Sequence, residues 1–255
     1  MALLNPKYRE LKPSAEYLTD KVVLAQAWKK AHHYIRSTNW YADTFELDRS
    51  AIDLDNQLDE WIKDIISDEF ILDTLTLIPA PKTDPWEYKE VLAGKAIFEA
   101  GYEYAADHLE NVNHAWAPKN EDSKALRPLA HVSIRDQSFI TALMMCLANK
   151  VETAQGDTAS AHEDVHERSV VNYGNRLYSQ FENGKADFSW GNSTTYSKYF
   201  TDYQRFLARP AHFGYEAKQR KIENEQVYEV HLDLEKFYDK VKRHILISKI
   251  RELVS

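Results

Sequence analysis

The chain has 255 residues, a formal net charge of −8, 44% hydrophobic and 12% aromatic residues. This composition is sufficient for a packed core and argues against global disorder, and the length allows one large domain or two small ones. The sequence contains no GxGxxG, GxxxxGK[ST] or GxSxG segment. This argues against a Rossmann dinucleotide site, a P-loop and the nucleophile elbow of α/β-hydrolases.

A single cysteine, Cys146, excludes a disulfide framework within the chain and a zinc site built from several cysteines. Because Cys146 lies in the apolar run 142–148, we expect a buried structural thiol rather than a nucleophile. The first twelve residues are too polar for a signal peptide, and no apolar run approaches the length of a membrane span. The sequence therefore predicts a cytoplasmic protein without a membrane partner.

Charge is distributed unevenly along the chain. Residues 1–118 carry 12 Lys and Arg against 21 Asp and Glu, which leaves 20 basic and 19 acidic residues for the rest. The overall acidity is therefore confined to the first part. The second part is balanced and can hold a local basic surface, as a nucleic-acid partner requires.

In the first part, apolar residues at helical spacing predict helices over 14–37, with Ser14 as its cap, and over 53–68. Alternation over 70–78 predicts a strand, and the prolines at 79, 81 and 85 predict a loop after it. A third helix is expected over 86–110. The polar segment 111–124 is the best internal boundary, so we place two regions at 1–120 and 121–255.

In the second part, 126–134 is expected to be a strand, with Pro128 at an edge or a bulge. A helix follows over 136–152, with Ile140, Leu143, Met144 and Leu147 as its core-facing side chains. Residues 153–168 are a predicted loop and 170–173 a short strand. An aromatic helix is expected over 193–208. Its stripe of aromatic residues favours core packing over a base-stacking platform.

The segment Val227–Leu234 alternates apolar and polar residues, which is typical of a half-buried strand. It carries Asp233 near its end, and a helix with its apolar residues between 241 and 254 follows. A carboxylate at the end of a strand, next to Phe237 and Tyr238, can hold a divalent cation beside a substrate. The alternative is an acidic residue favoured simply by the start of a helix.

Residues 162–166 read His-Glu-Asp-Val-His and match HExxH, in which two histidines one helical turn apart bind zinc beside a general base. The flanking residues are polar, and Asp164 places a charge inside a motif that usually lies along a buried helix. The third ligand is open, with Glu182 as one candidate. A loop is the favoured interpretation and a zinc hydrolase a remote alternative.

Two segments carry a resemblance to a known family. Residues 232–241, LDLEKFYDKV, resemble the first catalytic-carboxylate motif of reverse transcriptases, and residues 127–137, RPLAHVSIRDQ, with the helix after them, resemble the fingers motif of these enzymes. The segments 151–157, VETAQGD, and 173–177, YGNRL, look like parts of bacterial reverse transcriptases associated with antiphage defence. The resemblance covers 127–255, and residues 1–120 look like a helical N-terminal extension.

The resemblance implies an α+β fold, in which a helical extension precedes the fingers and an incomplete palm. It implies an RNA-directed DNA polymerase that adds dNTPs to a DNA or RNA primer on an RNA template with two Mg²⁺ or Mn²⁺ ions. Asp233 and the Leu234 carbonyl would be metal ligands, with Asp233 catalytic. The residues expected at the substrate are Arg127 at the triphosphate, Tyr238 as a steric gate for the ribose 2′-OH, Phe237 beside it, and Lys236 and Arg135 at template or primer phosphates.

One element of the family is absent from the sequence. The 255 residues contain no YxDD and end 22 residues after Asp233. Because one carboxylate cannot assemble a two-metal site, we expect this chain to be inactive alone, as a fragment or one part of an assembly with a missing palm and thumb portion or another subunit. A non-catalytic nucleic-acid-binding or interaction module is the alternative.

Overall fold

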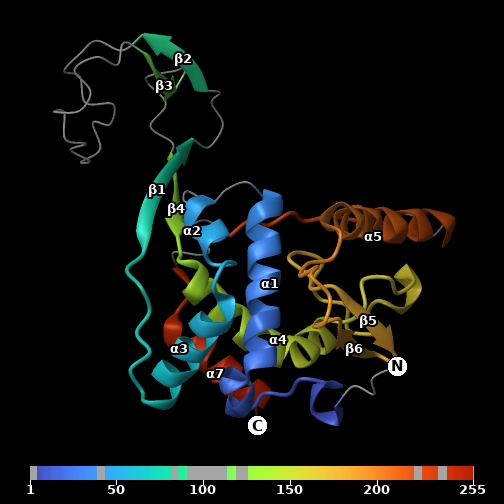
Figure 1. Ribbon diagram of the computed structural model, residues 1–255. Helices are drawn as coiled ribbons and strands as arrows, with labels where there is room; N and C mark the ends of the chain where they lie inside the picture. Colours follow the sequence, from blue (N-terminus) through green and yellow to red (C-terminus); the bar gives the residue numbers. More distant parts are fainter. Residues whose placement is uncertain are drawn as a thin grey trace. The chain divides into compact units, whose positions relative to one another are not determined.

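The computed structural model describes residues 5–38, 44–81, 86–90, 114–118, 126–220, 226–234 and 240–254 (Figure 1). The chain forms two compact units, of which the first joins Met1–Asp73 to Ser133–Ser255 and the second is Thr74–Val132. The predicted boundary between residues 120 and 121 falls inside the second unit. As a division between functional regions it stays a prediction.

In its described residues the first unit is mainly helical, with one short hairpin. Its elements are the 3-10 helices η1 (Pro6–Tyr8), η2 (Ala15–Thr19) and η4 (His162–Asp164), the strands β5 (Ser179–Glu182) and β6 (Lys185–Phe188), and the helices α1 (Lys21–Thr38), α2 (Thr44–Arg49), α3 (Leu54–Ile66), α4 (Ile134–Gln155), α5 (Tyr199–Arg220) and α7 (Arg243–Val254). Together with the strands of the second unit, these elements agree with the predicted α+β class.

The first predicted helix is divided into two elements. A 3-10 turn, η2, precedes α1, and the Ser14 side chain makes no capping hydrogen bond. Asp20 is the cap instead: its Oδ1 accepts the backbone N–H groups of Val22 at 2.9 Å and Val23 at 3.2 Å. Burial alone would raise the pKa of Asp20, but hydrogen bonds from Lys7, Val23 and Tyr8 hold it below its ordinary value. A carboxylate cap therefore sets the start of α1.

The core of the first unit lies between α1 and α4, which pack against each other and cross in the view of Figure 1. Small and medium side chains meet there, including Ala27 from α1 and Ala142 and Ala148 from α4. Alanine at these positions lets the two helices approach closely. The predicted helix α3 is confirmed and adds Leu58 and Trp61 to the same core.

Helix α4 is confirmed, but its predicted core stripe is wrong in part. Ile140 and Leu143 are exposed, and the buried face contains Ala142, Met145 and Ala148 instead. Three polar residues of α4, Asp136, Ser138 and Glu152, are also buried. A pattern of apolar residues cannot reveal this face because most of its members are small or polar. Cys146 is buried as expected, and burial raises the pKa of its thiol to about 11.

Several predictions for residues 170–220 are wrong. Helix α5 begins at Tyr199 rather than at 193 and continues through Pro210 to Arg220, and its aromatic stripe is exposed, so the predicted core packing is wrong. Residues 170–173 form no strand. The hairpin β5–β6 turns at Asn183 and Gly184, both with positive φ. This Asn-Gly pair is a strong hairpin signal that the periodicity analysis missed.

The described residues of the second unit form two antiparallel strand pairs. Strand β1 (Thr76–Pro81) pairs with β4 (Leu126–His131), and β2 (Trp86–Glu90) pairs with β3 (His114–Pro118). The strand predicted at 126–134 is confirmed as β4, whereas the strand predicted at 70–78 begins only at Thr76. The predicted loop at Pro79 and Pro81 is wrong, because β1 contains both prolines and Pro79 lies opposite Pro128.

A two-stranded sheet tolerates prolines because each strand has one unpaired edge, where the missing backbone N–H of proline removes no hydrogen bond. The helix predicted at 86–110 is wrong for 86–90, which form β2, and its remainder lies outside the described residues. The polar segment 111–124 contains β3. Pairing with a partner strand thus overrides the helical spacing at 86–90.

Two residues of the first unit, Asp73 and Ser133, flank the second unit in the sequence and are joined by a hydrogen bond. The Ser133 hydroxyl donates to the Asp73 carboxylate at 2.5 Å, and the Asp73 N–H donates to the Asp136 carboxylate at 2.6 Å. The chain ends that flank residues 74–132 are therefore fixed next to one another at the start of α4.

Candidate functional site

Asp233 lies in an extended segment, 226–234, that forms no strand, so the strand predicted there is wrong. A strand needs a partner, and the described residues provide none for this segment. Its apolar side chains are exposed, up to 88% at Leu232, and Leu234 is 67% exposed. Asp233 is exposed as well. The predicted carboxylate is thus accessible to solvent and to a ligand.

Among the described residues, no group of three or more His, Cys, Asp or Glu side chains is placed to hold a metal ion. Asp233 therefore belongs to no such group among these residues, and the Leu234 carbonyl follows it in the chain. Lys236, Phe237 and Tyr238 lie outside the described residues. Their predicted roles at the substrate stay predictions.

The two predicted arginines lie in different units. Arg127 is in β4 opposite Ala80, and its side chain lies outside the described part of the structure. Arg135 is in the first turn of α4 and is held within the protein. Its guanidinium pairs with Asp73 at 3.0 Å and Asp136 at 3.2 Å and lies 4.9 Å from the centre of the Phe70 ring. These contacts give Arg135 a structural role at the start of α4.

A buried ion pair joins the segments 151–157 and 173–177. Glu152 in α4 and Arg176 are only 2% and 3% exposed at their side chains, and their charged groups are 2.8 Å apart. The Leu177 N–H donates to the other carboxylate oxygen at 3.0 Å. The guanidinium also donates to the carbonyls of Asn172 at 2.7 Å and Gly156 at 2.5 Å. Both charges are thereby neutralised and hydrogen-bonded, as burial demands.

Gly156 makes this arrangement possible. It ends α4 with a φ of +78°, and a Cβ at its position would lie 2.7 Å from the Ser169 carbonyl oxygen and 2.8 Å from Val170 Cα. The backbone of the following loop therefore packs directly on Gly156, which brings its carbonyl to Arg176. Sequence reasoning identified both segments but not the contact between them.

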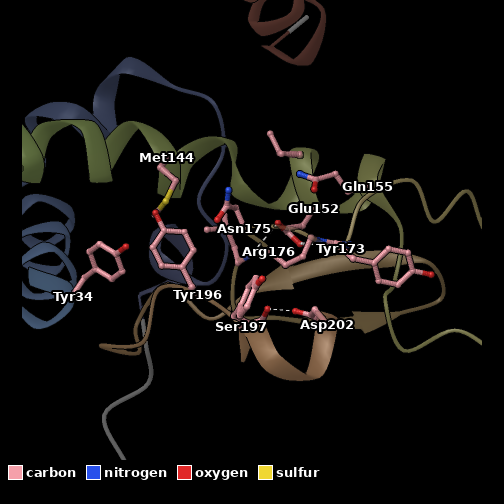
Figure 2. A pocket seen from close by; sticks show the side chains of 13 residues that line it. Tyr34, Met144, Glu152, Gln155, Tyr173, Asn175, Arg176, Tyr196, Ser197 and Asp202 are labelled. Atoms are coloured by element: carbon pink, nitrogen blue, oxygen red, sulfur yellow. Dashed lines mark hydrogen bonds and ion pairs between the residues drawn. The ribbon is translucent and has the colours of Figure 1, made fainter. Parts of the chain in front are cut away.

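A cavity of about 640 Å³ adjoins the ion pair (Figure 2). Four tyrosines and several polar side chains line it: Tyr34, Tyr173, Tyr196, Tyr199, Glu152, Gln155, Asn175, Arg176, Ser197 and Asp202. The rings of Tyr34 and Tyr196 lie 5.0 Å apart. Burial and the neighbouring Tyr34 raise the pKa of Tyr196.

Asp202, in the first turn of α5, closes the cavity on one side. It is 3% exposed, and it accepts hydrogen bonds from the hydroxyls of Ser197 and, at 2.8 Å, Thr158, besides an ion pair with Arg205 at 3.3 Å. Figure 2 shows Ser197 and Asp202 next to each other at this wall. No local sequence pattern selects Asp202, because its partners lie up to 44 residues away.

Lys30 is a second buried charge that the sequence analysis missed. It is 0% exposed and donates to the carbonyls of Thr194 at 2.7 Å and Ser189 at 3.2 Å, with its ammonium 4.6 Å from the Phe188 ring centre. Burial, with a smaller effect from Lys29, lowers the pKa of Lys30 to about 8. Lys30 thus fixes the segment after β6 on α1.

The lowered pKa of Lys30 predicts a pH dependence of stability. From about pH 8 to the ordinary pKa of 10.5, the unfolded chain binds more protons than the native protein, so the free energy of unfolding rises with pH. We expect the wild type to gain up to about 3 kcal/mol relative to Lys30→Met across this range, with the two carbonyl acceptors reducing the gain. Urea unfolding of both proteins at several pH values measures it. A difference that is constant or falls with pH contradicts the expectation.

The HExxH residues do not form the helix that a zinc peptidase requires. His162–Asp164 is a 3-10 turn within a loop, which confirms the loop interpretation. The His162 ring lies 5.2 Å from that of His212 in α5, and His212 Nε2 lies 3.8 Å from Glu163. The motif therefore contacts α5 through side chains, and it lacks the two histidines on one face of an α-helix.

Comparisons of this chain with protein-family models, with curated proteins and with solved structures found no match. Among the described helices, none has the length and apolar character needed to cross a membrane.

Proposed function

We propose that residues 127–255 are the fingers and first palm motif of an RNA-directed DNA polymerase. The proposal is based on the order and combination of RPLAHVSIRDQ at 127–137 and LDLEKFYDKV at 232–241. One structural observation supports it most: the two further segments with this resemblance, 151–157 and 173–177, meet in the buried pair of Glu152 and Arg176. The two segments are thus in direct contact, as expected if both belong to one folded domain. A role in antiviral defence is proposed on the same resemblance.

In this proposal Asp233 is the catalytic carboxylate and a ligand for Mg²⁺ or Mn²⁺, together with the Leu234 carbonyl. Its exposure suits this role, because a hard cation at a polymerase site is shared between one or two carboxylates, water and substrate phosphates. Nucleotide transfer uses two such ions, which a single carboxylate does not hold. The 255 residues contain no YxDD, so we expect no dNTP incorporation by this chain alone.

The substrate contacts are proposed in the same way. Arg127 would bind the incoming triphosphate through charge-assisted hydrogen bonds. Tyr238 would select deoxyribonucleotides, with Phe237 beside it and Lys236 at a nucleic-acid phosphate. Arg135 is the weaker candidate, because Asp73 and Asp136 already neutralise its guanidinium.

Manganese binding tests this proposal on the chain itself. With an RNA template, a DNA primer and the matching dNTP present, water relaxation should report Mn²⁺ bound to the protein complex. Asp233→Asn is expected to abolish this signal, because it removes the only carboxylate proposed as a ligand. Glu229→Gln is the matched control, since it neutralises another exposed carboxylate of the same segment, and it should retain the signal.

The metal and nucleic-acid binding results distinguish the polymerase from the non-catalytic module and from the zinc hydrolase. Equal Mn²⁺ binding by Asp233→Asn and wild type, or no binding to the template–primer, contradicts the polymerase proposal. Salt-sensitive binding of the nucleic acid without any role for Asp233 favours the non-catalytic module instead. A zinc hydrolase would require stoichiometric zinc that is lost in His166→Ala.

A further inference from the structure

The extended segment 226–234 lacks a partner strand among the described residues, although its side chains alternate as they do in a strand. On one side the Tyr228 hydroxyl donates to the Gln226 side chain, and on the other His231 Nε2 lies 3.2 Å from Glu229 Oε1. The first side is apolar and open to solvent: Tyr228, Val230, Leu232 and Leu234 are 67–88% exposed. Such a segment is a ready template for a further strand.

We propose that segment 226–234 pairs antiparallel with the same segment of a second copy of this chain, with Val230 opposite the partner's Val230. The contact is isologous, because the same residues of both copies form it, and it therefore closes as a dimer. This inference goes beyond the proposed polymerase function and does not rest on it.

The apolar side of the segment is complementary to itself in this register. Residues directly opposite one another in an antiparallel pair lie on the same side of the ribbon. With Val230 on the two-fold axis, Tyr228 lies opposite the partner's Leu232, and all residues from 226 to 234 are paired. A shift by one residue would put Val230 opposite the partner's His231 and mix the two sides.

The charged side selects the same register. Glu229 lies opposite the partner's His231, and His231 opposite the partner's Glu229, so the dimer contains two carboxylate–imidazole pairs. An imidazole N–H can donate to a carboxylate whether or not the ring is protonated. Registers centred on Glu229 or on His231 instead place acid opposite acid, Glu229 against the partner's Glu229 or against the partner's Asp233. A register centred on Leu232 avoids this clash but pairs only residues 230–234.

Helix α7 provides apolar side chains to cover the ribbon. A two-stranded ribbon is marginally stable alone and needs an element packed on its apolar side. Helix α7 follows the segment in the chain, and its apolar residues Ile245, Leu246, Ile247, Ile250 and Val254 are 38–51% exposed in the single chain. We expect the α7 helices of the two copies to pack on the apolar side of the ribbon.

Analytical ultracentrifugation and disulfide cross-linking of the full 255-residue chain test the inference without metal or nucleic acid. At increasing concentration the mass should approach twice the 29.7 kDa of one chain. Val230→Cys should cross-link to itself under copper phenanthroline and oxygen, because opposite Cα atoms lie about 4.5–5.5 Å apart, within the range of a disulfide. The native Cys146 is buried, so the wild type should not cross-link.

Leu232→Cys is the matched control for the register. Leu232 is exposed on the same side of the segment, but in the proposed dimer it lies about 14 Å from the partner's Leu232 along the ribbon. This variant should dimerise without forming the disulfide. Both positions are exposed in the single chain, so the substitutions should leave its circular dichroism unchanged.

A charge exchange tests the carboxylate–imidazole pairs. Glu229→Lys and His231→Glu should each raise the dissociation constant of the dimer about 5- to 30-fold, because symmetry makes each change twice. The double variant Glu229→Lys/His231→Glu opposes unlike charges again and should regain the affinity. A monomeric mass throughout, a dimer in which Val230→Cys does not cross-link, equal cross-linking of Leu232→Cys, or a double variant as weak as the single ones overturns the inference.

Discussion

Arg176→Met is expected to lower the free energy of unfolding by about 3–5 kcal/mol. The substitution leaves the Glu152 carboxylate, which is 2% exposed, without its cationic partner 2.8 Å away. It also removes the donors to the Gly156 and Asn172 carbonyls. A buried charge without a partner is far more costly than the loss of an exposed ion pair. Urea denaturation followed by circular dichroism measures the change.

Two further variants show whether the unpaired charge is the cause. Adding Glu152→Leu to Arg176→Met removes that charge and should restore part of the lost stability, although the Leu177 N–H then lacks its acceptor. Lys249→Met breaks an exposed ion pair with Glu252 and should cost less than about 1 kcal/mol. A double variant less stable than Arg176→Met would show that packing, rather than charge, dominates.

Gly156→Ala should destabilise the first unit by about 2–5 kcal/mol. The positive φ of +78° costs an alanine about 1–2 kcal/mol, and the added methyl would meet backbone atoms of Ser169 and Val170 at 2.7–2.9 Å. Since backbone cannot rotate away as a flexible side chain can, overpacking adds about 1–3 kcal/mol. Thermal or urea unfolding of the variant measures the sum.

Gly184→Ala separates strain from collision. Gly184 has a φ of +75°, nearly the same as Gly156, but a Cβ there would meet nothing within 4 Å. We expect this variant to lose only the strain component, about 1–2 kcal/mol. Equal losses in the two alanine variants would mean that the contact between Gly156 and the loop at Ser169 is not tight in solution.

Elements with a strong local signal could be predicted from the sequence. Helix α3 has apolar residues on one face, and α4 begins after Ser133, whose hydroxyl oxygen accepts the Asp136 N–H at 3.3 Å. Strand β2 could not be predicted, because its state depends on pairing with β3, 28 residues away in the register of Tyr88 with Trp116. The same limit applies to 227–234, where alternation is present but no partner strand lies among the described residues.

In the candidate site, too, residues with a local sequence signal could be predicted and residues that depend on distant partners could not. Asp233 was selected by its local sequence, and the structure adds its exposure. The cluster of Glu152, Arg176 and Gly156 depends on partners 20 and 24 residues apart, and Lys30 on partners 159 and 164 residues away. Buried charges of this kind carry no periodic pattern, so only the folded chain reveals them.

The hydrogen bonds of Asp73 with Ser133 and Asp136 have a consequence for how the protein is made. Helix α1 leaves the ribosome long before α4, its main packing partner, and cannot bury Val23, Leu24 or Ala27 until the whole second unit has been synthesised. Because the two ends of that insertion are held together, its length matters little to the first unit: doubling it would cost only about 0.6 kcal/mol of closure entropy. The helical unit would therefore tolerate a longer or shorter chain between Asp73 and Ser133 at little cost in stability.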